Sequence, residues 1–267
     1  MSNLYEKLPC ADVLLSIITV SYNDAARLSK TIQSLLPFYG DARYEHIVVD
    51  GGSTDQTVNV VGPLRSTHNF RFDSELDSGI YDAMNRGAQK SSGKFQLFLN
   101  CGDCMLATPD ELTLWLRELD HESVSIACFS FRQVDTDCYR MIIPEKVRRN
   151  KLPTSHQGMV FSSRFVQEHF YDTCYKIAAD YDLYLHAKPS QIIIAPMNSP
   201  LTSVEVHGVA SGNPVTSYKE YLLIAFRNLY GIELLVCFFR IACRAMVIIP
   251  IKLLFPYRWI KRLRFKS

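Results

Sequence analysis

Long apolar runs alternate with polar, cap-rich segments through the first hundred residues. Val13–Val20 and Tyr44–Asp50 are almost unbroken and rich in β-formers, which is typical of strands buried on both faces. The same pattern predicts two further strands and three helices in this half, namely strands 70–74 and 95–99 and helices 25–36, 54–61 and 79–89. Ser53 or Thr54 is expected to cap the second of these helices. Strand–helix alternation at this spacing predicts an α/β fold with a mainly parallel sheet flanked by helices.

The second half shows a weaker version of the same pattern. It predicts helices over 109–120 and 179–187 and strands over 124–131, 139–143, 157–161, 191–195 and 201–206. A Gly/Ser-bearing segment over 208–214 follows the last strand. We therefore expect one α/β domain over residues 1–214 and a helical, apolar and basic C-terminal region over residues 215–267.

Charge separates the two regions. The 267 residues include 29 Lys or Arg and 27 Asp or Glu, a net charge of +2, which argues against a nucleic-acid binder held by bulk charge. No acidic residue follows Glu233, whereas eight Lys or Arg do, so the preceding body is acidic. The eight cysteines are scattered, and the N-terminus shows no secretory signal pattern, so free thiols in the cytosol are expected. Cys101 and Cys104 have CxxC spacing but lack a second pair, which disfavours structural zinc.

The region Tyr221–Phe255 is strongly apolar but is interrupted by charges and by Pro250, which is expected to break a helix. A spanning helix needs about 20 apolar residues with few charges. An amphipathic segment at a membrane surface fits this pattern better, helped by the basic cluster that follows. The alternative is a pair of helices packed on the domain or in a homodimer.

Polar residues follow the predicted strands at the edge where ligands bind in parallel sheets. Asp50, Asp77 and the loop Asn100–Asp103 lie at or beyond strand ends. We therefore expect acidic groups from separate segments to converge on one crevice.

Five motifs occur in order along the chain: SIITVSYND, VVDGGSTDQT, SELDSGIYDAMNRGAQKSSGKFQLFLNCGD, SHQGMVF and AADYDLYLHA. Over roughly residues 14–211 the chain thereby resembles glycosyltransferase family 2, and more narrowly the bacterial enzymes of colanic acid, other exopolysaccharide or O-antigen synthesis. The resemblance implies a GT-A fold, a nucleotide-diphosphate sugar donor, a divalent metal (Mn²⁺ or Mg²⁺) and inversion at the anomeric carbon. UDP is favoured as the nucleotide, with GDP as the alternative.

The resemblance also assigns roles to residues. It implies donor-binding positions at Val20, Tyr22, Asn23, Asp50, Asp77, Gly79, Asn85 and His156. Asp82 is weighed as a phosphate-side residue against a capping role, and Ser53 and Thr54 are expected to be structural. His156 is expected to orient donor or acceptor.

The same resemblance implies that Asp103 binds the metal and that Asp180 is the catalytic base. The chain departs from the family here, because a pair of adjacent carboxylates is usual and only Asp103 remains. A single carboxylate can serve if the diphosphate completes the shell. His207 is weighed as a further ligand against an ordinary strand-end role. Asp182 does not share a helical face with Asp180.

These expectations lead to a hexosyltransferase that uses a lipid-linked saccharide acceptor, peripheral to the cytoplasmic face of the bacterial inner membrane. Two rivals remain. One is a sugar-phosphate nucleotidyltransferase, whose Gly-rich N-terminal loop with Arg and Lys is missing. The other is a catalytically weak, sugar-nucleotide-binding scaffold at the membrane. The basic loop over 144–155 is either a lid over the diphosphate or a solvated loop.

Overall fold

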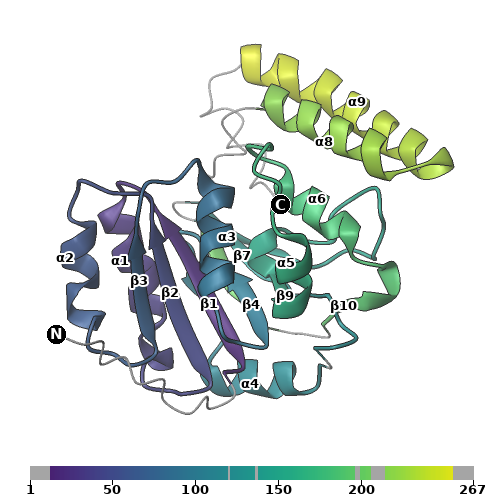
Figure 1. Cartoon of the computed structure of the whole chain (residues 1–267). Coiled ribbons are helices and arrows are strands. Elements are labelled where there is room, and N and C mark those ends of the chain that lie inside the picture. Colours follow the sequence, from purple (N-terminus) through teal and green to yellow (C-terminus); the bar gives the residue numbers. More distant parts are fainter. Residues whose placement is uncertain (1–12, 120, 136–137, 196–198, 206–213, 255–267) are drawn as a thin grey trace.

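The structure is a computed structural model that describes residues 13–119, 121–135, 138–195, 199–205 and 214–254. A seven-stranded mixed sheet runs through the molecule in the order β10-β6-β9-β4-β1-β2-β3 (Figure 1). Its strands are β1 (Leu15–Ser21), β2 (Tyr44–Asp50), β3 (Phe70–Ser74), β4 (Phe95–Phe98), β6 (Ile126–Cys128), β9 (Met159–Ser162) and β10 (Ile192–Ile194). A smaller sheet has the order β5-β11-β7-β8, formed by β5 (Cys104–Met105), β11 (Thr202–Glu205), β7 (Phe131–Asp135) and β8 (Cys138–Ile142). The predicted α/β class with a mainly parallel sheet is confirmed.

The strands β1 to β4 pair in parallel, whereas β9 runs antiparallel to both of its neighbours, β4 and β6. The segment that enters β9 is the short 3-10 helix η3 (His156–Gly158). Since β9 is reversed, η3 lies at the sheet edge where the parallel strands β1 and β4 end. The residues before β9 and those after β1 and β4 are thereby brought to one place.

Helices cover both faces of the large sheet. They are α1 (Ala25–Ser34), α2 (Thr57–Val61), α3 (Ile80–Lys90), α4 (Pro109–Arg117), α5 (Ser163–His169) and α6 (Ala179–His186). Alternate side chains of β1 divide between the two faces: Ile18 and Val20 pack with α3, α5 and α6, while Leu15 and Ile17 pack on the α4 side. Because Gly87 has no side chain, α3 can lie close to β1; a Cβ at this position would approach Ile18 Cγ2 to 2.4 Å.

Some elements differ from the sequence expectation. The single strand expected over 124–131 is two strands, β6 and β7, which belong to different sheets. Helix α5 was not predicted. Helix α2 begins at Thr57, and Asp55, not Ser53 or Thr54, accepts the hydrogen bond from the Thr57 N–H at 3.0 Å.

The C-terminal region forms two adjacent helices, α8 (Pro214–Asn228) and α9 (Gly231–Leu254), which join through a turn in which Gly231 has a φ of +55° (Figure 1). Helix α9 continues through Pro250, so the expected break is wrong. Buried residues of this hairpin belong to the same core as α3 and α6: they are Ile224, Ala225, Leu229, Cys237 and Ile241. In the described part of the chain, no helix has the length and apolar character that crossing a membrane requires.

Candidate active site

A cavity of about 410 Å³ opens where the carboxyl ends of β1 and β4 meet η3, α6 and α8. Three predicted groups, Asp103, His156 and Asp180, line it together with the Val20 end of β1. Other lining residues come from elements distant in sequence, including Arg27, Tyr81, Asn100, Gln157, Lys176, Ser217 and Tyr221. Of the acidic positions expected to converge at the strand ends, Asp103 lines this cavity and Asp50 and Asp77 do not, whereas Asp180, the expected base, does.

Asp103 lies in the turn that follows β4. The turn passes through Gly102, whose φ of +94° favours glycine, and a Cβ there would also collide with the guanidinium of Arg27. The Asp103 side chain is buried, with 4% of its surface exposed, and its Oδ2 accepts a hydrogen bond from Gln157 Nε2 at 3.2 Å. This turn therefore places the Asp103 carboxylate on the cavity wall, and Gly102 leaves room beside it for the guanidinium of Arg27 from α1.

His156 connects the two halves of the site. Its Nδ1 lies 2.8 Å from Asp180 Oδ2, and its Nε2 lies 2.9 Å from Asn100 Nδ2. The second oxygen of Asp180, Oδ1, is buried and has no hydrogen-bond partner among the residues that the structure describes. Asp180 thus has one oxygen fixed by histidine and one oxygen free to accept a proton.

The hydrogen bonds around His156 are compatible with two charge states of its ring. If Asn100 Nδ2 donates to Nε2, the imidazole is neutral and carries its proton on Nδ1, facing Asp180. A doubly protonated ring would need an acceptor at Nε2, and the buried Asn100 Oδ1, which lacks a partner among the described residues, could take that place if the amide turned over. The Asn100 amide can therefore serve both charge states of His156.

Burial and charge act in opposite directions on this cluster. Burial raises the pKa of Asp103 to about 6, against the charge of His156 and the hydrogen bond from Gln157, which lower it. Burial lowers the pKa of His156, but the charge of Asp180, its hydrogen bond and the charge of Asp103 outweigh that effect, so the pKa is raised. Both groups are thus able to change charge near neutral pH.

The residues predicted for the nucleotide lie beside the cavity, at the ends of β1, β2 and β3. Tyr22 is 65% exposed and packs with Asp77 around Gly51. A Cβ on Gly51 would lie 2.6 Å from Asp77 Oδ2 and 3.2 Å from Tyr22 Cδ2, so only glycine leaves both side chains in place. An exposed aromatic ring beside a carboxylate is suited to a planar base and its polar edge.

Asp50 and Asn23, both predicted as donor-binding residues, make hydrogen bonds within the loops that follow β1 and β2. The Asp50 carboxylate is fully buried and accepts hydrogen bonds from Ser53 N–H (2.9 Å), Ser53 Oγ (2.5 Å) and Ser74 Oγ (2.7 Å). Asn23, at a φ of +49°, accepts a hydrogen bond from Thr54 N–H at 2.9 Å. These contacts link the loop after β1 to the loop after β2. The structural role expected of Ser53 and Thr54 follows from them, and the carboxylate of Asp50 lies behind the cavity.

Helix α3 begins at the site, but Asn85 does not reach it. Gly79 precedes α3 with a φ of +135°, and its N–H donates to Asp77 Oδ1 at 3.0 Å. Asp82 accepts from the N–H of Ser78, which is the capping role weighed for it. The Asn85 amide donates to the carbonyl of Tyr171 and accepts from its N–H, both at 2.9 Å. Its side chain is therefore committed to the Tyr171 backbone.

Several cavity residues were not predicted from sequence. Arg27 on α1 and Lys176 before α6 are cations on its wall, and Tyr81, Ser217 and Tyr221 add hydroxyl groups and rings. For Arg27, the sequence offered one indication: it follows Asp24 by three residues at the start of the helix after β1, so the two side chains share a helical face. For Ser217 and Tyr221 the sequence offered no indication, because the C-terminal region was expected to be separate from the domain.

The metal implied by the resemblance is assigned to Asp103; Glu205 also lines the cavity, but its carboxylate is paired with Lys30 at 2.5 Å and with Arg27 at 3.4 Å. No group of three or more His, Cys, Asp or Glu that could hold a metal occurs within the part of the chain that the structure describes. The burial of Asp103 and its raised pKa nonetheless fit a group that faces a cation when a ligand is bound. His207 lies outside the described residues. Asp182 accepts a hydrogen bond from Asn228 Nδ2 at 3.4 Å and is not a cavity residue.

The basic loop is attached to the helices behind the cavity. Tyr181 and Tyr184 of α6 donate to the carbonyls of Arg149 and Arg148, at 2.8 and 2.9 Å. Arg240 of α9 donates to the carbonyl of Asn150. Leu152 and Ser155, at the end of the loop, line the cavity. The middle of the loop, residues 148–150, is thus bound to α6 and α9, and its last residues contribute to the cavity wall.

The fold and site together define an α/β protein with a cavity at the carboxyl edge of its sheet, into which Asp103, His156 and Asp180 are brought together. Comparison with known proteins gives the family. Residues 16–178 match Glycosyl transferase family 2, and the chain belongs to this family. An uncharacterized glycosyltransferase of Mycobacterium tuberculosis is 33% identical over 180 residues, covering 65% of this chain and 68% of that protein. A PGL/p-HBAD biosynthesis glycosyltransferase of Mycobacterium bovis is 36% identical over 95 residues, covering 34% of this chain and 36% of that protein.

Solved structures with the same fold are more distant in sequence. TarS 1–349 of S. aureus in complex with UDP superposes with a TM-score of 0.69 at 17% identity, covering 94% of this chain and 78% of that one. The chain spans 44% of a longer TarS structure. The mannosyltransferase PcManGT from Pyrobaculum calidifontis, solved with GDP-Man and Mn²⁺, gives a TM-score of 0.58 at 15% identity over 88% of this chain and 70% of that one. These likenesses confirm the expected GT-A-like fold.

Proposed function

We propose that the chain is an inverting, metal-dependent hexosyltransferase that moves a sugar from a nucleotide-diphosphate donor to a hydroxyl of a lipid-linked saccharide, in the synthesis of a bacterial surface polysaccharide. The observation that carries the proposal is the shared cavity in which Asp103 faces Gln157 and Asp180 is held by His156. The Asp103 carboxylate suits the side of the leaving diphosphate, and the Asp180 carboxylate suits the side of the acceptor hydroxyl. A UDP-sugar is the first donor to test and a GDP-sugar the second.

The donor side follows from the exposed and charged groups at the strand ends. Tyr22 and Asp77 offer a ring and a carboxylate to the nucleotide, and Arg27 and Lys176 supply positive charge along the cavity wall. Asp103 would hold a divalent cation together with the diphosphate oxygens, and this cation supplies charge that offsets the leaving group. Donor and metal are therefore expected to bind together, with weak metal affinity in the absence of nucleotide.

The acceptor side uses the free oxygen of Asp180. The acceptor hydroxyl oxygen forms a bond to the anomeric carbon, the bond from that carbon to the diphosphate oxygen breaks, and the hydroxyl proton passes to Asp180 Oδ1. The nucleoside diphosphate leaves with the bonding electron pair. A single displacement of this kind inverts the anomeric configuration. His156 holds the carboxylate through its other oxygen, Oδ2, which leaves Oδ1 without a hydrogen-bond partner among the described residues.

This activity is tested with purified protein, a panel of nucleotide sugars and a polyprenyl-diphosphate-linked saccharide. We expect one donor to raise the melting temperature, more so with Mn²⁺ or Mg²⁺ than without, because a ligand bound only by the native state stabilises it. We also expect release of nucleoside diphosphate and a product of inverted configuration by NMR. Binding without turnover on any lipid acceptor would favour the scaffold alternative, and pyrophosphate release from a nucleoside triphosphate would favour the nucleotidyltransferase.

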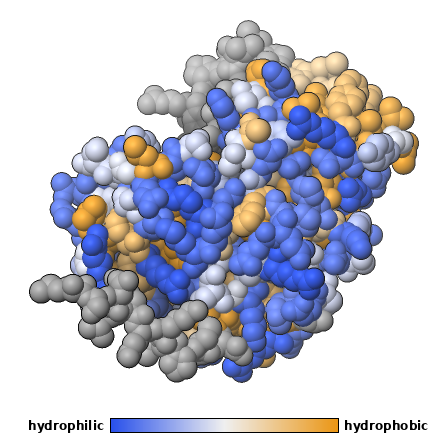
Figure 2. Space-filling model, in the orientation of Figure 1, coloured by the Kyte–Doolittle hydropathy of each residue, from blue (hydrophilic) through white to orange (hydrophobic). Residues whose placement is uncertain are grey.

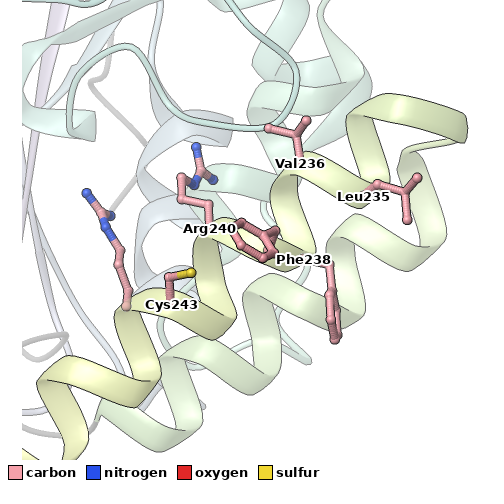
Figure 3. A pocket seen from close by; sticks show the side chains of 7 residues that line it. Leu235, Val236, Phe238, Arg240 and Cys243 are labelled. Atoms are coloured by element: carbon pink, nitrogen blue, oxygen red, sulfur yellow. The ribbon is translucent and has the colours of Figure 1, made fainter.

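The hairpin α8–α9 supports the proposed location at the cytoplasmic face of the inner membrane. Figure 2 shows apolar residues gathered over the end of the molecule that the hairpin forms. Leu235, Phe239 and Met246 are 65%, 71% and 75% exposed, and their spacing places them on one side of α9, away from the buried Cys237 and Ile241. Figure 3 shows this segment of α9, with the apolar side chains of Leu235, Val236 and Phe238, and with Arg240, which is bound to the carbonyl of Asn150. A peripheral helix that binds anionic lipid combines such features.

Vesicle flotation tests this location. The wild type should float with vesicles of phosphatidylglycerol and phosphatidylethanolamine more than with neutral phosphatidylcholine, and the difference should shrink with salt. Leu235→Ser combined with Phe239→Ser should weaken binding to anionic vesicles. Leu114→Ser, at a site on α4 that is 62% exposed, is the matched control and should bind like the wild type. Equal flotation of all variants, or a homodimer that buries this face in solution, would contradict membrane docking through α9.

A further inference from the structure

Helix α8 makes a second contact with the active site, through a buried carboxylate. Glu220 is only 9% exposed and accepts three hydrogen bonds from consecutive backbone N–H groups. Its Oε1 accepts from Lys176 at 2.9 Å, and its Oε2 accepts from Ile177 at 2.9 Å and from Ala178 at 3.0 Å. Bonds from N–H groups to an ionised carboxylate are among the stronger hydrogen bonds in proteins, so this segment is firmly held.

The held segment leads directly into the candidate base. Ala178 is the N-cap residue of α6 and has no side-chain capping bond of its own, and Asp180 follows two residues later. Lys176 and Ile177 themselves line the cavity. On the opposite side, Tyr81 of α3 donates to the carbonyl of Ile177 at 2.6 Å. The segment before Asp180 is therefore clamped between α3 and α8.

We propose that Glu220 is a positioning residue for sugar transfer, which acts by fixing the backbone that places Asp180 against His156 and Lys176 on the cavity wall. The inference rests on the proposed function, in which Asp180 accepts the acceptor proton. Glu220 touches neither substrate nor His156; from another helix it holds the backbone N–H groups of the three residues that precede α6. The C-terminal helices are then a part of the catalytic apparatus.

Glu220→Gln is the variant that removes this function with the least change in volume. A glutamine has one acceptor oxygen, so if that oxygen faces Ile177 and Ala178, its amide NH₂ faces the N–H of Lys176, and two donors oppose each other. We expect kcat for transfer to fall about 10- to 100-fold, as for a small displacement of a catalytic group. The KM for the nucleotide sugar should change less than kcat, because Tyr22 and Asp77 lie on other elements and, of the proposed donor-side groups, Lys176 alone lies on the held segment.

Two control variants on α8 separate positioning from loss of stability. Lys219→Ala changes the neighbouring exposed residue and should retain wild-type kcat. Ile224→Ala removes a fully buried side chain about one turn further along α8 and should lower the melting temperature. If Ile224→Ala and Glu220→Gln lose the same fraction of kcat at equal loss of melting temperature, Glu220 is only structural and the inference is overturned.

The variant Asp180→Asn distinguishes failure of this inference from failure of the proposed function. If Glu220 acts through Asp180, Glu220→Gln should cause no further loss of residual transfer when Asp180→Asn is already present. Full activity of Asp180→Asn alone would refute the assignment of the base. Loss of activity in Asp180→Asn with wild-type kcat in Glu220→Gln would overturn the positioning role alone.

Discussion

The Nδ1 atom of His156 lies 2.8 Å from Oδ2 of Asp180, so a residue that precedes β9 is joined to the start of α6. The contact leaves Oδ1 of Asp180 buried and without a partner among the described residues. A carboxylate held in this way has one fixed oxygen and one available oxygen. This geometry distinguishes Asp180 from Asp103 and leads to different expectations for the two.

Asp180→Asn should reduce transfer to a small residual rate while donor binding is retained. Asparagine keeps the shape and can still accept from His156, but it does not take up a proton at neutral pH. Asp103→Ala should abolish transfer and should, in addition, weaken metal-dependent nucleotide binding. Calorimetry with nucleotide, with and without Mn²⁺, measures the difference. Full transfer activity in purified Asp180→Asn would exclude this residue as the base.

The rate of transfer should rise with pH through the titration of His156. The charge and hydrogen bond of Asp180, with the charge of Asp103, raise the pKa of His156 above its ordinary 6.5 despite the opposing effect of burial. Below that pKa an imidazolium pairs with Asp180 and makes it a poorer proton acceptor; above it, the neutral ring only donates through Nδ1. The measurement is kcat between pH 5.5 and 9. His156→Gln forms no imidazolium, so persistence of the same rise in this variant would contradict the assignment.

Asp103→Asn should stabilise the ligand-free protein at neutral pH. Burial raises the pKa of Asp103 from 3.8 to about 6 in the folded state. The folded protein therefore favours the protonated carboxyl. The contribution of Asp103 to the free energy of unfolding is fully present below pH 3.8 and is lost as pH rises through 6. The shift corresponds to about 3 kcal/mol. Urea unfolding at pH 7.5 should show a gain of roughly 1–3 kcal/mol for Asp103→Asn, and at pH 4 the gain should largely vanish. Equal gains at both pH values would contradict the charge explanation.

His46 should make the fold sensitive to mild acid. Its ring is buried between Tyr39 Oη at 2.8 Å and Thr19 Oγ1 at 3.0 Å, and burial lowers its pKa from 6.5 to about 3. Between pH 6.5 and 3, His46 is protonated in the unfolded chain but not in the folded chain. The free energy of unfolding is therefore highest above pH 6.5 and decreases as pH falls toward 3. The melting temperature of the wild type should fall with decreasing pH over this range more steeply than the melting temperature of His46→Gln. Parallel curves would show that His46 does not control the acid response.

The sequence predicted the first half of the fold better than the second, for a physical reason. The strands β2 and β3 coincide with the predicted ranges, since Tyr44–Asp50 and Phe70–Ser74 are each bounded by polar turn residues. The run 124–131 has no such boundary, and its division between two sheets depends on pairing with β9 and β11. Helix α5 was missed because its short, polar sequence shows little periodicity.

Site residues that directly follow strands could be predicted from the sequence. Site residues on helices that are distant in sequence from the rest of the site could not. Asp103 follows β4, so sequence order alone placed it at the ligand edge. Asn85 had suitable helical spacing, but only the folded chain shows its amide bonded to Tyr171. Glu220 and Tyr221 lie about forty residues beyond Asp180, and no local pattern links them to it.

The reversed direction of β9 has a consequence for how this enzyme can diversify. Parallel strands supply their ends to the part of the cavity proposed for the nucleotide, whereas β9 supplies its beginning to the part proposed for the acceptor. The connection that arrives there, from β8 through residues 144–158, can thus be exchanged without altering the order of any parallel strand. Under the proposed function, related enzymes could change their acceptor by changing this one connection, while the strand ends proposed for the donor stay the same.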